Sequence, residues 1–345
     1  HGSVIYRGDV YMAGTDEWRA GETLIQRMTV AIPPATPPGD YRVRIAWVGR
    51  ASNQYVAYAG ESGASGAIWA EIGTLAVTRP ASFPDPAALP MDVRQPTEVA
   101  PGVVLLGWDA PQSSLRPGEM LTPTLYWQAA DSARPAFRMQ ALLRGAPGET
   151  VLWTGQPVDD RYTADQWAEW EVLADRAQWT IPREQPAGDY SLVLLVGATA
   201  IQVGQVEVVG VARLFVPPPV ATVMNVNFGD KARLYGYTVE HTNKTLSLEI
   251  VWQSFDNIPT DYKVFVHLVG ADGIILAQRD AMPKSDTYPT SLWLPDEYVI
   301  DTYEFPALDA GYAFRVGLYS PEDGARLPVL GAQHDEMGDF VEILP

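Results

Sequence analysis

Apolar and polar residues alternate along many short runs of this chain. In residues 41–47 the apolar side chains take the odd positions and arginines stand between them, and residues 246–252 repeat the alternation. Turn residues end these runs at 146–148, 271–273 and 322–324. A period of two with tight turns predicts antiparallel strands packed face to face. We therefore expect an all-β fold of tandem antiparallel β-sandwich domains, immunoglobulin-like or jelly-roll-like.

An internal repeat supports this expectation. A shift of 149 residues places residues 18–41 on residues 167–190 without a gap. It matches Trp18 with Trp167, Glu22 with Glu171, and the Gly-Asp-Tyr triplet at 39–41 with that at 188–190. A shift of 125 residues places the Trp-Gln pair at 127–128 on the Trp-Gln pair at 252–253. Self-similarity at such spacings indicates copies of one supersecondary unit.

The repeat and the prolines predict the domain boundaries. We expect β-sandwich units at 1–78, 102–216 and 217–345, with a linker at 79–101. Six prolines in that linker fix φ and remove N–H donors, so it should be extended and poorly paired. Unit 1–78 matches only the second half of the repeat. Two interpretations stay open: a natural chain that continues upstream, or a smaller sandwich that is complete as it stands.

One segment combines helix and strand signals. Residues 163–166 read Thr-Ala-Asp-Gln, the pattern of a helix capping box, and residues 167–177 have helix-favouring composition. The matching residues 18–33 contain glycine and several β-branched side chains, which favour a strand. We expect a strand after residue 172, with at most a single helical turn around Trp167.

Charge and composition exclude several classes of protein. The chain has 345 residues, 42 acidic and 24 basic, for a net charge of -18. Such a chain lacks the basic field that nucleic-acid binding requires. It has no cysteine, so it can form neither disulfides nor thiolate sites. No run approaches the roughly 20 apolar residues of a membrane helix, so no transmembrane segment is expected.

Catalytic patterns are weak throughout. His241, His267 and His334 lack the short spacings of a metal site, and no EF-hand string appears, although calcium binding stays open. The serine in residues 60–66 lacks the spacing of a nucleophile elbow. Acidic pairs such as that at 159–160 would suit a glycosidase only if they opposed each other across a cleft. We predict no catalytic residue, no metal and no cofactor.

Aromatic residues carry the remaining signal. Trp127 and Trp252 fall on inward positions and are predicted to be core residues. Trp18, Trp167 and Trp293 repeat at one loop, where a structural wedge and a sugar-stacking platform are both open. The densest group of aromatic and acidic residues is the candidate ligand-binding patch, with packing of a sandwich edge as its alternative. Its members are Trp153, Asp159, Asp160, Tyr162, Trp167 and Trp170.

Several phrases resemble a known family. They are YKVFVHL at 262–268, AQRD at 277–280, YPTSLWLP at 288–295, LRPGE at 115–119 and LYWQA at 125–129. They resemble the β-sandwich region C-terminal to the membrane part of many bacterial glycosyltransferases of the dolichyl-phosphate-mannose mannosyltransferase type. The resemblance implies an extracytoplasmic location and a parent enzyme whose chemistry lies in membrane loops elsewhere. It assigns no catalytic residue to this chain.

Three functional interpretations follow. The first is a non-catalytic, extracellular spacer and recognition region that belongs to a membrane glycosyltransferase and contacts a glycan or a cell-surface partner. The second is a structural cell-surface protein, such as a layer or adhesin segment, that assembles through sheet edges. The third is a glycoside hydrolase. The sequence leaves the oligomeric state open.

Overall fold

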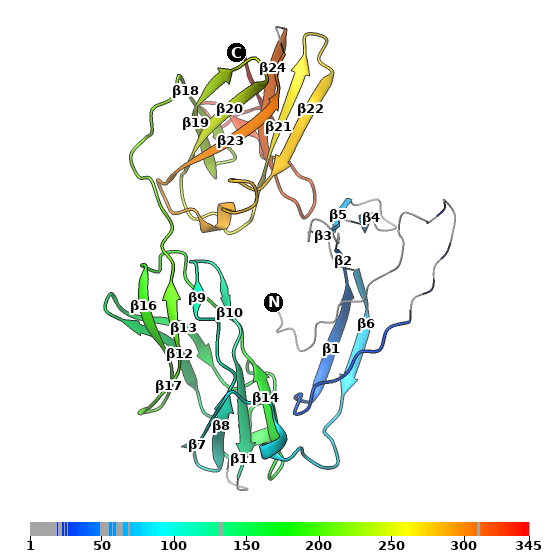
Figure 1. Cartoon of the computed structure of the whole chain (residues 1–345), viewed down its shortest axis with the longest axis vertical. Helices are drawn as coiled ribbons and strands as arrows, with labels where there is room; N and C mark the ends of the chain where they lie inside the picture. The colour runs from blue at the N-terminus through cyan, green and yellow to red at the C-terminus, as the bar shows by residue number, and fades with distance from the viewer. Residues whose placement is uncertain are drawn as a thin grey trace. The chain divides into compact units, whose positions relative to one another are not determined.

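The chain is β-rich in every part that the computed structural model describes (Figure 1). The described residues are 19, 23, 25, 27–48, 70–130, 134–308 and 311–344, together with the backbone of 55–56, 58–59 and 65–67. Helical structure in these residues is limited to short 3-10 turns. The expected all-β class is therefore confirmed.

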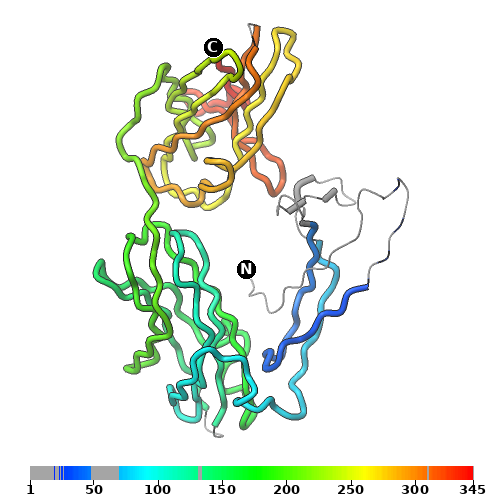
Figure 2. The backbone as a smooth tube through the Cα atoms, viewed as in Figure 1, coloured from blue at the N-terminus to red at the C-terminus, as the bar shows by residue number. Residues whose placement is uncertain are grey.

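The chain divides into two compact units. One holds residues 1–43 and 73–210, and the other holds residues 44–72 and 211–345. Each contains one complete two-layered sandwich, and the chain finishes the first before it enters the second (Figure 2).

Three small sheets precede the sandwiches. β1 (Gly39–Ile45) pairs with β6 (Ala70–Val77). The other two sheets join β2 (Trp47–Val48) to β3 (Tyr55–Val56), and β4 (Tyr58–Ala59) to β5 (Ser65–Ala67). Trp18 and the serine-containing segment 60–64 lie outside the described residues, so the predictions for them stay predictions.

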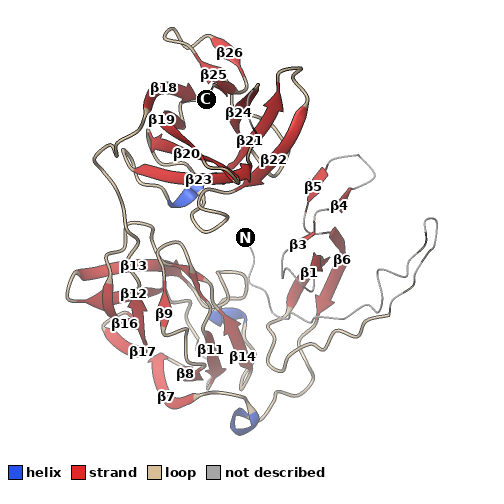
Figure 3. Ribbon diagram, turned by 45° about the horizontal axis from the view of Figure 1, so that its top comes forward, coloured by secondary structure: helices blue, strands red, loops and turns tan. Residues whose placement is uncertain are grey.

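The first sandwich packs a four-stranded sheet, β14-β11-β8-β7, against a five-stranded sheet, β13-β12-β16-β17-β9 (Figure 3). The strands of the two sheets are β7 (Val93–Ala100), β8 (Val103–Trp108), β9 (Ser114–Leu115), β11 (Thr124–Ala129), β12 (Met139–Gly145), β13 (Gly148–Gly155), β14 (Val172–Arg176), β16 (Gly188–Val196) and β17 (Thr199–Val208). A separate two-stranded sheet pairs β10 (Met120–Leu121) with β15 (Trp179–Thr180). Trp127 is fully buried in their shared core, where its ring meets Phe137 edge-on at 6.2 Å. Its predicted inward position is confirmed.

The second sandwich packs a six-stranded sheet, β23-β20-β19-β18-β25-β26, against a four-stranded sheet, β22-β21-β24-β27. The strands are β18 (Thr222–Phe228), β19 (Ala232–His241), β20 (Thr245–Ser254), β21 (Lys263–Gly270), β22 (Ile275–Ala281), β23 (Tyr298–Pro306), β24 (Tyr312–Tyr319), β25 (Val329–Leu330), β26 (Glu336–Gly338) and β27 (Val341–Ile343). Trp252 is fully buried, with Phe228 edge-on at 5.4 Å. This prediction is confirmed as well.

The predicted linker at 79–101 differs from the expectation in its second half. Residues 93–100 form β7, which pairs with β8 at the edge of the four-stranded sheet. Pro96 is tolerated because the pairing is interrupted between Arg94 and Thr97, so its missing N–H breaks no regular ladder. Poor pairing therefore describes only the first half of the stretch.

That first half packs against the sandwich. Leu89 is buried, and with Met91 it covers Leu106 and Tyr126 on the outer face of the four-stranded sheet. A 3-10 turn at Pro86–Ala88 precedes it, capped by the Asp85 carboxylate, which accepts a hydrogen bond from the Ala87 N–H at 2.9 Å. The first half of the linker thus covers an apolar face of the sheet, a role that its proline content did not indicate.

The segment with mixed signals resolves as expected. Residues Ala164–Gln166 form one 3-10 turn, and the Gln166 side-chain oxygen accepts a hydrogen bond from the Thr163 N–H at 3.1 Å. β14 begins at Val172. The second sandwich has the same turn at Thr290–Leu292.

Candidate functional site

The most completely bonded polar cluster of the first sandwich joins Arg79 to Tyr162 and Glu171. Nε of Arg79 lies 3.2 Å from Oε2 of Glu171, and the Tyr162 hydroxyl donates to the same oxygen at 3.0 Å. The Arg79 guanidinium also donates to the Tyr162 hydroxyl and, at 2.6 Å, to the carbonyl oxygen of Gln166. Glu171 is buried, so its charge is balanced by a residue that precedes the sandwich.

The second sandwich repeats this cluster with Arg213, Tyr288 and Glu297. Nη1 of Arg213 lies 2.5 Å from Oε2 of Glu297 and 2.6 Å from the Tyr288 hydroxyl. It also donates to the carbonyl oxygen of Leu292 at 3.0 Å. The Tyr288 hydroxyl donates to Oε1 of Glu297 at 2.7 Å. We call each arrangement the arginine clamp.

A tryptophan lies beneath each clamp. The indole N–H of Trp167 donates to the carbonyl oxygen of Tyr162 at 3.0 Å, and that of Trp293 donates to Tyr288 at 3.2 Å. Both indoles are buried. This burial favours the structural wedge over the sugar platform at these two positions.

Each clamp carboxylate is also bonded to the backbone. Oε2 of Glu171 accepts from the Ala168 N–H at 2.6 Å, and Oε2 of Glu297 accepts from the Leu294 N–H at 2.9 Å. Burial and the neighbouring Glu297 raise the pKa of Tyr288 well above its usual value. The arginine, tyrosine and carboxylate of each clamp are therefore bonded to one another and to backbone, an arrangement suited to structure.

A left-handed turn accompanies each clamp. Residues 158–160 and 284–286 all have φ between 53° and 66°, three in succession in each sandwich. The Asp175 carboxylate accepts from the Val158 N–H at 3.0 Å, and Asp301 accepts from the Lys284 N–H at 3.0 Å. Burial raises the pKa of Asp175 to about 6 and also raises the pKa of Asp301.

The candidate ligand patch is divided by the structure. Tyr162 and Trp167 do meet, but inside the clamp. Trp153 is half-buried against the core, with its ring 6.4 Å from that of Trp179. Asp159 and Asp160 are exposed on the left-handed turn, where Oδ1 of Asp160 accepts from the Gln156 N–H at 3.1 Å. Trp170 alone presents an exposed ring, 55% accessible.

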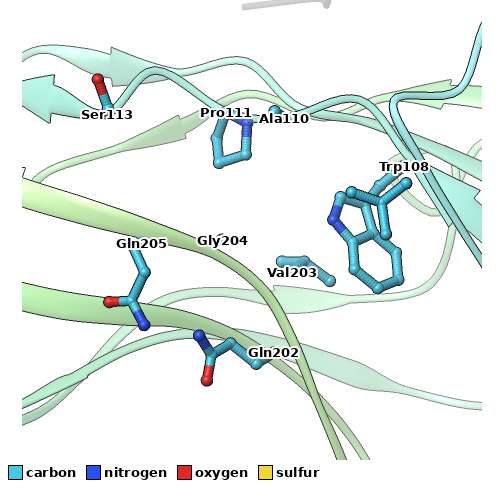
Figure 4. Close-up of a pocket in the computed structure, with 9 residues that line it drawn as sticks. Trp108, Ala110, Pro111, Ser113, Gln202, Val203, Gly204 and Gln205 are labelled. Carbon is cyan, nitrogen blue, oxygen red and sulfur yellow. The ribbon is translucent and has the colours of Figure 1, made fainter.

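A shallow groove of about 390 Å³ opens at the side of the first sandwich (Figure 4). Figure 4 shows Pro111 facing the strand that carries Val203 and Gly204, with the Trp108 indole at one end. Gly204 is required there, because a Cβ would lie 2.5 Å from Pro111. No ionisable side chain lines the groove, so it offers no acid–base chemistry.

The histidines lie apart in the second sandwich. Nε2 of His267 is 3.9 Å from Asp280, and Nδ1 of His334 is 3.2 Å from Asp230. Across the described ranges, no three His, Asp or Glu residues gather as metal ligands. Nor does any helix in those ranges have the length and apolar character to cross a membrane.

The sequence analysis missed the arginines of the clamp. The available signal is a Val-x-Arg triplet, at 77–79 and at 211–213, with a glutamate four residues after each loop tryptophan, at Glu171 and Glu297. Neither pattern indicates contact, because each arginine is far along the chain from its partners: 83 residues for Arg79 and Tyr162, 75 for Arg213 and Tyr288, and 84 for Arg213 and Glu297.

Comparison with known proteins yields only distant likenesses. No family model matches the chain, and no curated protein matches it. Trypsin-activated α-2-macroglobulin from Escherichia coli is 10% identical over 68% of this chain and 15% of its own, with a TM-score of 0.19. The native protein's fragment spanning domains NIE-MG1 is 11% identical over 70% of this chain and 99% of its own, with a TM-score of 0.16. The chain thus spans about a seventh of the first protein, and scores this low carry no argument about function.

Proposed function

We propose that this chain is a non-catalytic array of β-sandwich domains that acts as a spacer and recognition region on the extracytoplasmic side of a bacterial membrane glycosyltransferase. The observation that carries the spacer role is the repeated arginine clamp. β6 ends at Val77 and β17 ends at Val208, and a clamped arginine follows each within a few residues. A linker anchored so soon after a strand has little slack.

The clamps also support the absence of catalysis. Two of the buried pairs of acid and tyrosine, Glu171 with Tyr162 and Glu297 with Tyr288, are each bonded to an arginine and to backbone. Removing the arginine would leave a buried charge unpaired. Their structural bonds therefore explain the presence of these buried carboxylates without a catalytic role.

Limited proteolysis and sedimentation test the spacer role. We expect the intact chain to resist trypsin at Arg213, and the variant Glu297→Gln to be cleaved there much faster. We also expect a monomer at every concentration reached in sedimentation velocity. Equal cleavage of both proteins, or rapid cleavage of the parent chain, would remove the clamp argument. Release of chromogen from aryl glycosides by the purified chain would contradict the non-catalytic assignment.

The link to a membrane enzyme has its own test. The open reading frame that encodes this chain should also encode membrane helices and a glycosyltransferase region. A frame that holds only further sandwich units would contradict that link while leaving the spacer role intact.

A structural cell-surface protein is the second candidate. β22 is the edge strand of its sheet, and it begins with Ile275 and Leu276, about half exposed, after the more exposed Ile274. An apolar sheet edge can pair with another chain. Concentration-dependent association that is lost in Ile275→Lys would favour this candidate over the monomeric spacer.

A further inference from the structure

Trp170 has an unusual combination of backbone and exposure. It lies between the 3-10 turn Ala164–Gln166 and β14, with φ of 61°. Its N–H donates to the carbonyl oxygen of Ala129 at 2.9 Å, which holds this conformation in place. A left-handed backbone is uncommon outside glycine, asparagine and aspartate, and it is a marked outlier for a bulky residue.

The other copies of the repeat have ordinary residues at this position. Asp296 of the second sandwich has φ of 63°, and its N–H donates to the carbonyl oxygen of Ser254 at 3.0 Å. In the first repeat the ungapped register that places Trp18 on Trp167 puts Gly21 opposite Trp170. Since aspartate and glycine suit this backbone, the turn itself does not require tryptophan.

Packing does not require it either. Trp167 and Trp293 are buried in the cores, whereas the Trp170 ring belongs to neither sandwich core among the described residues and is 55% exposed. The left-handed backbone and the exposed apolar ring each cost stability. Such a residue points to a role at the surface.

We propose that the Trp170 indole is a stacking platform for a neutral sugar ring. The exposed residues that precede it in the loop are polar: Asp165, Gln166 and Glu169. Carboxylates and amides can bond sugar hydroxyls while the indole covers the apolar C–H face of the ring. The acidic neighbours disfavour anionic ligands, and these exposed residues are polar, whereas the residues around a protein hot spot exclude water. The proposal rests on the recognition role above and assigns it to one residue.

The test uses the full chain and neutral oligosaccharides. An array of neutral hexasaccharides of glucose, mannose, galactose and N-acetylglucosamine identifies the best probe, and calorimetry measures its affinity. Trp170→Asp, which installs the residue of the second sandwich, should weaken binding by roughly tenfold or more. Trp170→Tyr should retain most of the affinity. The aspartate variant should also unfold at a higher temperature than the parent chain, because the backbone strain is relieved.

Each outcome separates this assignment from the wider role. Binding that is unchanged in Trp170→Asp overturns the platform and leaves recognition to another surface. An array with no neutral sugar bound overturns both. A lowered unfolding temperature in Trp170→Asp contradicts the claim that tryptophan is retained here at a cost to stability.

Discussion

Arg213 and Glu297 stand 84 residues apart in the chain and lie 2.5 Å apart in the fold, from Nη1 to Oε2. Arg79 and Glu171 form the same relationship in the first sandwich at 3.2 Å. In both, an arginine that follows the last strand of one repeat neutralises a buried carboxylate of the next sandwich. The stability of each sandwich therefore depends on chain that a boundary drawn at its strands would remove.

The two clamps should differ in strength. The Arg213 side chain is 12% exposed and that of Arg79 is 43% exposed, so solvent screens the first pair less. Arg213→Ala should lower the free energy of unfolding of the second sandwich by about 3 kcal/mol. Arg79→Ala should cost the first sandwich clearly less. Urea denaturation followed by tryptophan fluorescence measures both, and the reverse order would contradict this account.

The clamp can be checked by neutralising its acid. In Arg213→Ala the remaining Glu297 carboxylate is buried without a cation, so adding Glu297→Gln should recover part of the lost stability. The same urea titration gives the answer. A double variant less stable than Arg213→Ala alone would argue against an unpaired charge as the cause.

Asp175 should make the first sandwich sensitive to pH. Its folded-state pKa is about 6 against 3.8 for the free side chain, so the folded state holds the proton more tightly. Stability is then lost as the pH rises from about 4 to about 6, by roughly 3 kcal/mol in all. Asp175→Asn does not titrate, so its advantage over the parent chain should grow across that window. Denaturation midpoints of the two proteins at pH 4 and pH 7 measure it, and a constant difference would contradict the prediction.

Gly236 is required where the start of β18 and the residues before it lie against β19. A Cβ there would lie 2.5 Å from the carbonyl oxygen of Thr222 and 2.7 Å from Val220. Gly107 has the same role in the first sandwich, where a Cβ would meet the carbonyl oxygen of Val93 in the neighbouring strand β7. Gly236→Ala should therefore destabilise the second sandwich by about 2 kcal/mol in thermal unfolding. Gly210→Ala is the milder comparison and should cost clearly less, because a Cβ at this exposed position would meet only the Ala187 methyl group, at 3.1 Å. Equal effects would remove the steric argument.

A tyrosine near the start of a long strand bonds back to the preceding loop in two repeats, in β1 and in β16. The hydroxyl of Tyr41 donates to the carbonyl oxygen of Pro37 at 2.7 Å, and that of Tyr190 donates to Pro186 at 2.9 Å. Tyr190→Phe should cost about 1 kcal/mol in denaturant titration, because Tyr190 is buried. Tyr312→Phe is the matched control, since no hydrogen bond involves its hydroxyl in the described part of the chain. A cost as large in the control would contradict the assignment.

The alternation of apolar residues was enough to predict the strands and the inward tryptophans. Side chains alternate across a strand whatever it pairs with, so residues 246–252 already placed Trp252 in a core. The repeat supplies a second copy of each pattern. The glycine and β-branched residues of the matching segment 18–33 favour a strand over a helix at β14. These are local properties, and a sequence carries them directly.

The tertiary structure alone decided what the charged and aromatic residues of the loops do. Trp167 and Trp170 stand three positions apart with similar surroundings in the sequence, yet one ring is buried and the other is half exposed. The arginines that pair with Glu171 and Glu297 come from chain more than 80 residues away. A buried charge is tolerated only where the fold brings a counter-charge to it, and no local pattern records that meeting.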